Sequence, residues 1–288
     1  MTQNGITRRQ HYVPDFYLQG WATDDGKVTA HDLQSLKDKK TFRTDPANVL
    51  VQSYFYEEDT ANPDNRIENI LSAMEGRTAS VVKKVRAVTA ATDVKAAAAT
   101  LSRSLTGAGV DVLAEFAAYQ YMRVPGAIEQ KRYELQTSAL DETTKTHHLN
   151  PGRFVEGGYA YVVDHFKAMK YLFFISSGQD FVTSDWPCFD MDEDNRGTLL
   201  GEEVGRKTDV VAYMPLTPRV GMVMYPVGIN QASLNSRRWG ASVQPDSFVR
   251  NQNTLIIQKA ERYVVARKES PFIFAVAVKR RKSQPQSL

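Results

Sequence analysis

The sequence is short of cysteine and of long apolar segments, and both shortages exclude classes of protein. Its single cysteine, Cys188, cannot form an internal disulfide, which is typical of proteins in a reducing cytoplasm. A zinc site made of several cysteines is excluded for the same reason. No apolar run approaches the roughly 20 residues that span a bilayer, and the first residues contain no apolar stretch typical of a secretory signal. We therefore expect a cytoplasmic protein with no membrane partner.

Several motifs that would identify a cofactor or a reaction are also missing. The aspartates of residues 190–194 resemble a calcium loop, but Asn195 occupies its glycine position and Gly201 its final glutamate position. A phosphate-binding loop, a zinc-protease helix and a nucleophile elbow are absent from the sequence. Any reaction therefore has to be inferred from less common groups of polar residues.

The composition is that of an ordinary globular protein, but the charge is unevenly distributed. Apolar residues make up 42% and charged residues 24% of the 288 positions, and the net charge is only +3. Residues 77–103 contain six basic side chains and one acid, whereas residues 190–203 contain six acids and one base. A basic face attracts phosphates, so nucleic acid is a candidate partner. The alternative is that these basic side chains are only the solvent-exposed face of a helix.

The order of the sequence patterns predicts one α+β domain. We find no internal repeat and no long linker, so residues 1–278 are expected to form a single integrated domain. It has three parts: a polar box and short strands (8–56), a helical middle (62–170), and a strand-rich part with a late helix (171–278). This order favours a central helical bundle packed with a mostly antiparallel small sheet over an alternating α/β fold. Residues 279–288 predict a disordered basic tail.

Periodicity places the clearest elements. Apolar residues at three- and four-residue spacing predict a helix over 110–124, which a proline ends. Runs of β-branched and aromatic residues predict strands over 171–176 and 220–225. A last helix is expected over 245–267, followed by a final strand over 271–278.

The densest feature is the box of residues 10–18, Gln-His-Tyr-Val-Pro-Asp-Phe-Tyr-Leu. Because Pro14 follows His11 by three residues, the intervening backbone should be extended or turned, which would hold the imidazole at a fixed angle. A histidine titrates near neutrality and can serve as a general base, an acid or a metal ligand. The alternative is that the aromatic residues are core and His11 is a hydrogen-bonded core residue.

Two glutamates share a face of the first long helix. Glu68 and Glu75 are seven residues apart, which is two turns, or roughly 10 Å between their Cα atoms. Either residue suits a metal ligand or an acid–base group. Solvent-exposed helix acids are the alternative.

An amide and a guanidinium end the central helix. Gln120 and Arg123 lie on one face at i and i+3, and Gln120 is otherwise surrounded by apolar positions. A buried guanidinium needs a partner, and a carboxylate such as Glu75 or Asp185 would suit it, as would a substrate phosphate. A structural ion pair is the alternative.

A further acid follows a predicted strand. Asp185 lies where the strand turns, with the hydrogen-bond donors Thr183 and Ser184 before it. Functional side chains are often presented at such strand ends. The alternative is a side chain that closes a turn before Pro187.

Taken together, these elements resemble a bacterial family catalogued as domain of unknown function 4238. The resemblance covers nearly the whole chain, and the family has no assigned activity, so it implies kinship of fold and supplies no reaction. The matching residues are Gln10 to Pro14, Phe16 to Leu18 and Trp21 of the box, Ile67, Glu68 and Glu75, Gln120, Arg123 and Pro125, Thr183 to Asp185 and Pro187, and the turn Met214 to Pro218.

The polar residues among these matches suggest one hydrolytic site. We hypothesise that His11, Glu75, Arg123 and Asp185 converge as catalytic residues of a nuclease-like phosphodiesterase, in a defence or toxin effector. His11 or Glu75 would act as the base, and Arg123 would steady the phosphate charge. Asp185 would orient the base or, with Glu75, hold a divalent metal. Substrate-binding roles are expected for Gln10, Gln120, Thr183 and Ser184.

Two other functions stay open at this point. One is a non-enzymatic binding or interaction module in which the polar residues form a buried structural network. The other is a nucleotide or small-molecule hydrolase, which predicts a closed pocket in place of an open basic groove.

Overall fold

Helices occupy the middle of the chain, and strands lie before and after them. The computed structural model describes residues 7–90, 93–136, 139–150, 152, 160–191, 211–226 and 237–283, to which all structural statements below refer. This mixed arrangement in one domain confirms the predicted α+β class. The helices are α1 (Asp15–Leu18), α2 (Arg66–Thr89), α3 (Val94–Ser104), α4 (Gly107–Met122), α5 (Pro125–Gln136), α6 (Glu142–Leu149), α8 (Ala160–Ala168), α9 (Asp246–Lys259) and α10 (Pro271–Ser283).

Three sheets are found among the described residues, and they are mostly antiparallel as expected, although one small sheet was predicted. The largest has the order β10-β5-β9-β8-β7, and only its β10–β5 pair is parallel. The second has the order β3-β2-β11-β6, and β1 pairs with β4 in the third. The strands are β1 (Arg9–His11), β2 (Val28–Asp32), β3 (Thr41–Thr44), β4 (Val51–Ser53), β5 (Lys170–Ser176), β6 (Thr183–Ser184), β7 (Phe189–Asp190), β8 (Ala212–Thr217), β9 (Val220–Tyr225), β10 (Trp239–Gln244) and β11 (Tyr263–Ala266).

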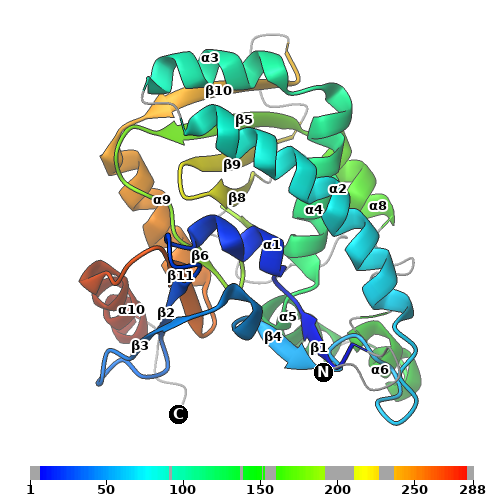
Figure 1. Cartoon of the computed structure of the whole chain (residues 1–288). Coiled ribbons are helices and arrows are strands. Elements are labelled where there is room, and N and C mark those ends of the chain that lie inside the picture. The colour runs from blue at the N-terminus through cyan, green and yellow to red at the C-terminus, as the bar shows by residue number, and fades with distance from the viewer. Residues whose placement is uncertain are drawn as a thin grey trace.

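The central helices follow directly from local sequence. Apolar residues of α2 at three- and four-residue spacing face inward, among them Ile67, Leu71 and Met74. Thr106 caps the start of α4, since its side chain accepts a hydrogen bond from the N–H of Gly109 at 3.1 Å. Figure 1 shows α2 and α4 running side by side along one flank of the molecule, consistent with their contact.

Helix α1, which follows Pro14 of the box, lies in Figure 1 between the strands β8 and β9 on one side and β2 and β11 on the other. Tyr17 and Trp21 are fully buried. The Tyr17 hydroxyl contacts the Thr183 hydroxyl at 2.8 Å and the carbonyl oxygen of Pro215 at 2.6 Å, and so joins β6 to β8. The Trp21 indole N–H donates to the carbonyl of Phe181 at 2.7 Å.

The C-terminal part differs from the sequence prediction. Residues 271–278, expected as a strand, form the first part of α10, because Pro271 is tolerated in a first helical turn and Ile273 and Ala277 bury one helical face. The late helix ends at Lys259, and the strand β11 follows it. The basic residues 279–282 and Ser283, expected to be disordered, continue α10, while residues 284–288 lie outside the described part of the chain.

In the described residues, no helix combines the length and the apolar character needed to cross a membrane.

Helix α9 is attached to the segment before β6 by one buried amide. The Asn253 side-chain oxygen accepts from the N–H of Val182 at 2.9 Å, and its nitrogen donates to the carbonyl of Asp180 at 3.0 Å. Only 1% of Asn253 is exposed. One side chain therefore satisfies two backbone groups of a neighbouring segment.

Replacement of this amide should destabilise the fold. We expect Asn253→Ala to lower the free energy of unfolding by about 2–3 kcal/mol, because two backbone groups lose their partners. Urea denaturation measures this, with Asn251→Ala as the matched control, since Asn251 is exposed on the same helix. Equal stability of the two variants would contradict the bracing role of Asn253.

Candidate functional site

A fully buried guanidinium is the centre of the candidate site. Arg123 follows the last residue of α4, and none of its side chain is exposed. Its Nη2 donates to Oε1 of Glu75, on the neighbouring helix α2, at 2.9 Å. Gln120 lies one turn earlier, and with its amide oxygen toward the guanidinium it accepts from Nε at 2.8 Å and from Nη2 at 2.6 Å. The expected contact between Glu75, Gln120 and Arg123 is thus present.

The partners of Arg123 offset the burial of its charge. Burial lowers the pKa of Arg123, but the neighbouring Tyr56 and Glu75 raise it by more, so the pKa lies above its ordinary value. A buried charge is tolerated only with such partners. Arg123 is therefore a permanent cation inside the protein.

Carboxylates from α2 surround this cation. Burial and, to a lesser extent, the nearby charge of Glu75 raise the pKa of Glu68 to about 7, although Arg123 lowers it. Burial also raises the pKa of Glu75, while Arg123 opposes the increase. The two glutamates interact as their shared helix face predicted, and the site contains one carboxyl group that is partly protonated at neutral pH.

The box contributes His11 and Asp15 to the same place. His11 ends β1, and its backbone carbonyl accepts from the Tyr56 hydroxyl at 3.1 Å. Burial lowers the pKa of His11, Asp15 raises it, and the charges of Arg9 and Arg123 lower it. The net direction is downward, so the imidazole is neutral at pH 7. We call His11, Asp15, Glu68, Glu75, Gln120 and Arg123 the Arg123 cluster.

Three buried atoms of this cluster have no hydrogen-bond partner within the described part of the chain. They are Nε2 of His11, Oδ1 of Asp15 and Nη1 of Arg123. Buried polar atoms almost always have partners, whether in the protein or in ordered water. The cluster thus contains one donor, one acceptor and one imidazole nitrogen without a protein partner. We infer that a water molecule or a ligand supplies their hydrogen bonds.

Gln10 forms hydrogen bonds with Glu57 and with Tyr56, the tyrosine next to the cluster. Its amide nitrogen donates to Oε1 of Glu57 at 2.7 Å, and its oxygen accepts from the N–H of Tyr56 at 2.8 Å. Gln10 is fully buried. These contacts hold Tyr56 in position beside the cluster.

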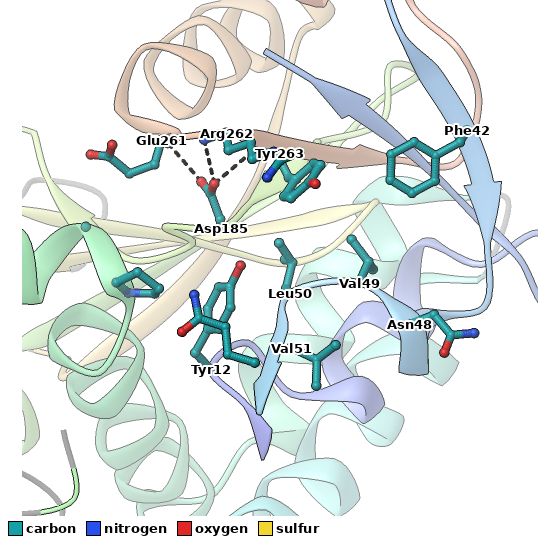
Figure 2. Close-up of a pocket in the computed structure, with 13 residues that line it drawn as sticks. Tyr12, Phe42, Asn48, Val49, Leu50, Val51, Asp185, Glu261, Arg262 and Tyr263 are labelled. Carbon is teal, nitrogen blue, oxygen red and sulfur yellow. Dashed lines mark hydrogen bonds between the residues drawn. The ribbon is translucent and has the colours of Figure 1, made fainter. Parts of the chain in front are cut away.

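Asp185 occupies a different environment. Its two carboxylate oxygens accept from the backbone N–H groups of Glu261, Arg262 and Tyr263 at 3.0, 2.6 and 2.8 Å (Figure 2). Burial raises the pKa of Asp185 to about 6, although the three N–H groups lower it. Its carboxylate closes the turn into β11, and not the turn before Pro187 that the alternative had proposed.

The two residues before Asp185 also have structural partners. Thr183 contacts the Tyr17 hydroxyl, and the Ser184 hydroxyl contacts the N–H and the carbonyl of Trp186 at 3.1 and 3.0 Å. The structure thus divides the predicted site: His11, Glu75, Gln120 and Arg123 come together, while the hydrogen bonds of residues 183–185 are directed elsewhere.

Glu75 and Asp185, the two residues expected to hold a metal ion, are not brought together. Glu75 binds Arg123, and Asp185 binds the turn before β11. Among the residues that the structure describes, no group of three or more His, Cys, Asp and Glu side chains is arranged to hold a metal ion.

Two residues of the site region, Asp15 in the cluster and Tyr56 beside it, could not be assigned to it from the sequence. Asp15 lies inside the box and directly after Pro14, in the first turn of α1, where an acidic residue is also ordinary. Because acidic residues are common in a first helical turn, this position gave no reason to assign Asp15 to a site. Tyr56 carries no local signal, because only tertiary packing brings it to Arg123.

Fold and site together define a mixed α+β protein with a buried cluster of acid–base residues around one arginine. The sequence model of the family described as "Protein of unknown function (DUF4238)" matches residues 9–270 of the 288. The chain belongs to this family. No curated protein and no solved structure matches it.

Removing the Asp185 carboxylate should affect stability. We expect Asp185→Ala to lower the free energy of unfolding by about 2–4 kcal/mol, since three backbone N–H groups lose their acceptor. Denaturation in urea measures the loss, and Asp24→Ala, at an exposed turn position, is the control. A loss as small as that of the control would refute the turn-closing role.

Glu68 should make stability depend on pH. Its pKa is about 7 in the folded protein against 4.5 in the unfolded chain, so the native state binds the extra proton, and stability falls as pH rises from about 5 to 8. We expect Glu68→Gln to reduce this fall by about 1–2 kcal/mol, less than the full shift because the side chain is partly exposed.

The measurement is urea denaturation at pH 5 and at pH 8. Glu142→Gln is the control, since that side chain is 88% exposed. An unchanged pH dependence in Glu68→Gln would show that Glu68 has an ordinary pKa.

Proposed function

We propose that the chain hydrolyses phosphodiester bonds at the Arg123 cluster, as a nuclease-like enzyme. One observation carries the proposal: the unpaired Nη1 of Arg123 lies in the same cluster as the unpaired Nε2 of a neutral His11. Such a pair suits a tetrahedral anion, because the guanidinium donates to a phosphoryl oxygen while the imidazole accepts a proton.

The residues divide the reaction between them. His11 would take a proton from the attacking water while the oxygen of that water forms a bond to phosphorus. Arg123 would donate to the non-bridging oxygen on which negative charge develops. Glu68, partly protonated at neutral pH, would give its proton to the leaving oxygen as the phosphorus–oxygen bond breaks. Glu75 would hold Arg123 in place and, being engaged by it, would not act as the base.

Charge on the surface bears on the kind of substrate. The exposed Lys83 and Lys84 of α2 support a long polyanion such as nucleic acid. An activity of this kind would suit a cytoplasmic defence or toxin effector.

A small phosphodiester or nucleotide is the second candidate, and one hollow favours it. Next to the cluster lies a cavity of about 250 Å³ with Glu57, Glu58, Asp59 and Asp64 in its lining. Its volume suits a small substrate better than a long chain, although its carboxylates disfavour the phosphate of either.

A non-enzymatic interaction module is the third candidate. The full burial of Arg123 and its pairing with Glu75 favour it, because a structural ion pair needs no substrate. The three unpaired atoms of the cluster are the observation that this candidate leaves unexplained.

The test is cleavage of single-stranded RNA, DNA and cyclic dinucleotides by the purified protein, with and without magnesium. We expect cleavage of at least one substrate and a loss of about 100-fold or more in kcat/KM for His11→Gln. The activity should rise with pH through the pKa of His11, below 6.5, because only the neutral imidazole accepts a proton. It should fall again above about pH 7, where Glu68 has lost the proton that it donates.

His165→Gln is the matched control, since His165 is a half-buried histidine on α8 with a similarly lowered pKa. Activity that survives in His11→Gln would remove His11 from the mechanism. Absence of cleavage under every condition would favour the interaction module.

A further inference from the structure

A second cavity, of about 350 Å³, lies where the box, β4, the start of α5 and the turn before β11 meet. Tyr12, the residue after His11, lines it, as do Pro125 and Gly126, which closely follow Arg123. Its volume falls within the range of about 300–1,000 Å³ typical of small-molecule pockets. None of the functions proposed above uses it.

Aromatic rings form much of the cavity wall. Tyr12, Phe42 and Tyr263 line it from the box, β3 and β11. The rings of Phe42 and Tyr263 meet edge to face with centroids 6.1 Å apart. Figure 2 shows the Tyr12 ring rising toward Leu50 and Asp185, opposite the turn that carries Tyr263. Rings on several sides suit a flat ligand that stacks or packs edgewise.

Polar groups are placed around these rings. The Tyr12 hydroxyl makes no hydrogen bond to any described residue, and the amide nitrogen of the exposed Asn48 is likewise open, because only its oxygen binds Arg9, at 2.8 Å. The Arg262 guanidinium lies 4.6 Å from the Tyr263 ring centroid. A ligand in this cavity therefore meets both donors and acceptors at its edges.

The backbone of one wall residue is strained. Leu50 is buried and has a φ of 57°, in the left-handed region that a branched side chain rarely adopts. Strained backbone that the surrounding structure maintains is concentrated at ligand sites. This observation is independent of the composition of the lining.

The charge of the residues that line the cavity restricts the class of ligand that it can bind. The lining contains the carboxylates of Asp185 and Glu261 and one cation, Arg262, which is itself paired with Asp32 at 3.1 Å. The local charge is negative overall, so phosphate and other anions are disfavoured. Among ligands that this charge does not repel, an uncharged one fits the aromatic walls without needing a partner for its own charge, and the Asp185 carboxylate already accepts three backbone N–H groups.

We propose that this cavity binds a neutral, flat heterocycle with hydrogen-bonding edges, of the size of a nucleobase or nucleoside. The ring packs between the aromatic side chains, while the Tyr12 hydroxyl and the Asn48 amide form hydrogen bonds with polar atoms at its edge. The open amide nitrogen of Asn48 would donate to an acceptor of the ring, since its oxygen already accepts from Arg9. The site is separate from the Arg123 cluster and requires no hydrolysis.

The experiment is titration calorimetry of the full chain with adenosine, guanosine, cytidine and uridine, beside ribose and adenosine 5′-monophosphate. We expect at least one nucleoside to bind, ribose not to bind, and the monophosphate to bind more weakly than adenosine. Tyr263→Leu should weaken nucleoside binding by about tenfold or more, because base–aromatic stacking is lost. Tyr133→Leu is the matched control, since Tyr133 is 74% exposed on α5.

A second pair of variants separates loss of binding from loss of fold. Asn48→Ala and its control Asn69→Ala both change exposed amides, so both should keep the wild-type melting temperature, and only Asn48→Ala should weaken binding. The proposal is overturned if no nucleoside binds at millimolar concentration, if the monophosphate binds more tightly than adenosine, or if the lining variants bind like their controls. Nucleosides contain no phosphodiester bond, so this result is independent of the hydrolysis test.

Discussion

The hydroxyl of Tyr17 makes the contact on which the rest of the structure depends. A hydroxyl has one hydrogen, which Tyr17 donates to the carbonyl of Pro215 in β8, so the Thr183 hydroxyl of β6 must be the donor in the second bond. The two larger sheets are thereby joined through one buried oxygen. With the Trp21 bond to Phe181, this contact positions the box, and the box in turn positions His11 and Asp15 beside the end of α4.

The second constraint is the charge buried at Arg123. A guanidinium without exposure has to be matched by groups brought from elsewhere, and α2 supplies Glu75 for this purpose. Glu68 lies partly buried near Glu75 on the same helix, and its burial and the charge of Glu75 raise its pKa. The burial of these charged groups thus creates the electrostatic conditions for acid–base chemistry, which is why a structural network and a catalytic site are difficult to distinguish by composition.

The box also connects two regions with different chemical character. His11 belongs to the Arg123 cluster, whereas its neighbour Tyr12 lines the aromatic cavity beside the Asp185 turn. Similarly, Arg123 lies in the cluster, and Pro125 and Gly126 line the cavity. Asp185 was grouped with the catalytic residues because a carboxylate at a strand end suits chemistry. Its real partners are three backbone N–H groups, which leave no pattern in the sequence.

The sequence by itself determined what depends on local periodicity and on residue type. Sequence patterns predict the α+β class, the helix over residues 110–124, the strand of residues 220–225 and the shared face of Gln120 and Arg123. The need to neutralise a buried charge predicts a carboxylate partner for Arg123, with Glu75 and Asp185 both as candidates, and only the packing selects Glu75. The tertiary structure alone decided what depends on long-range packing. It made residues 271–278 a helix, because their apolar side chains bury one helical face, and it divided the strands among three sheets. It also brought Tyr56 to Arg123 and Asp15 to Glu75, and it directed Asp185 to the turn before β11, since contacts between distant segments are set by the packing of the whole chain.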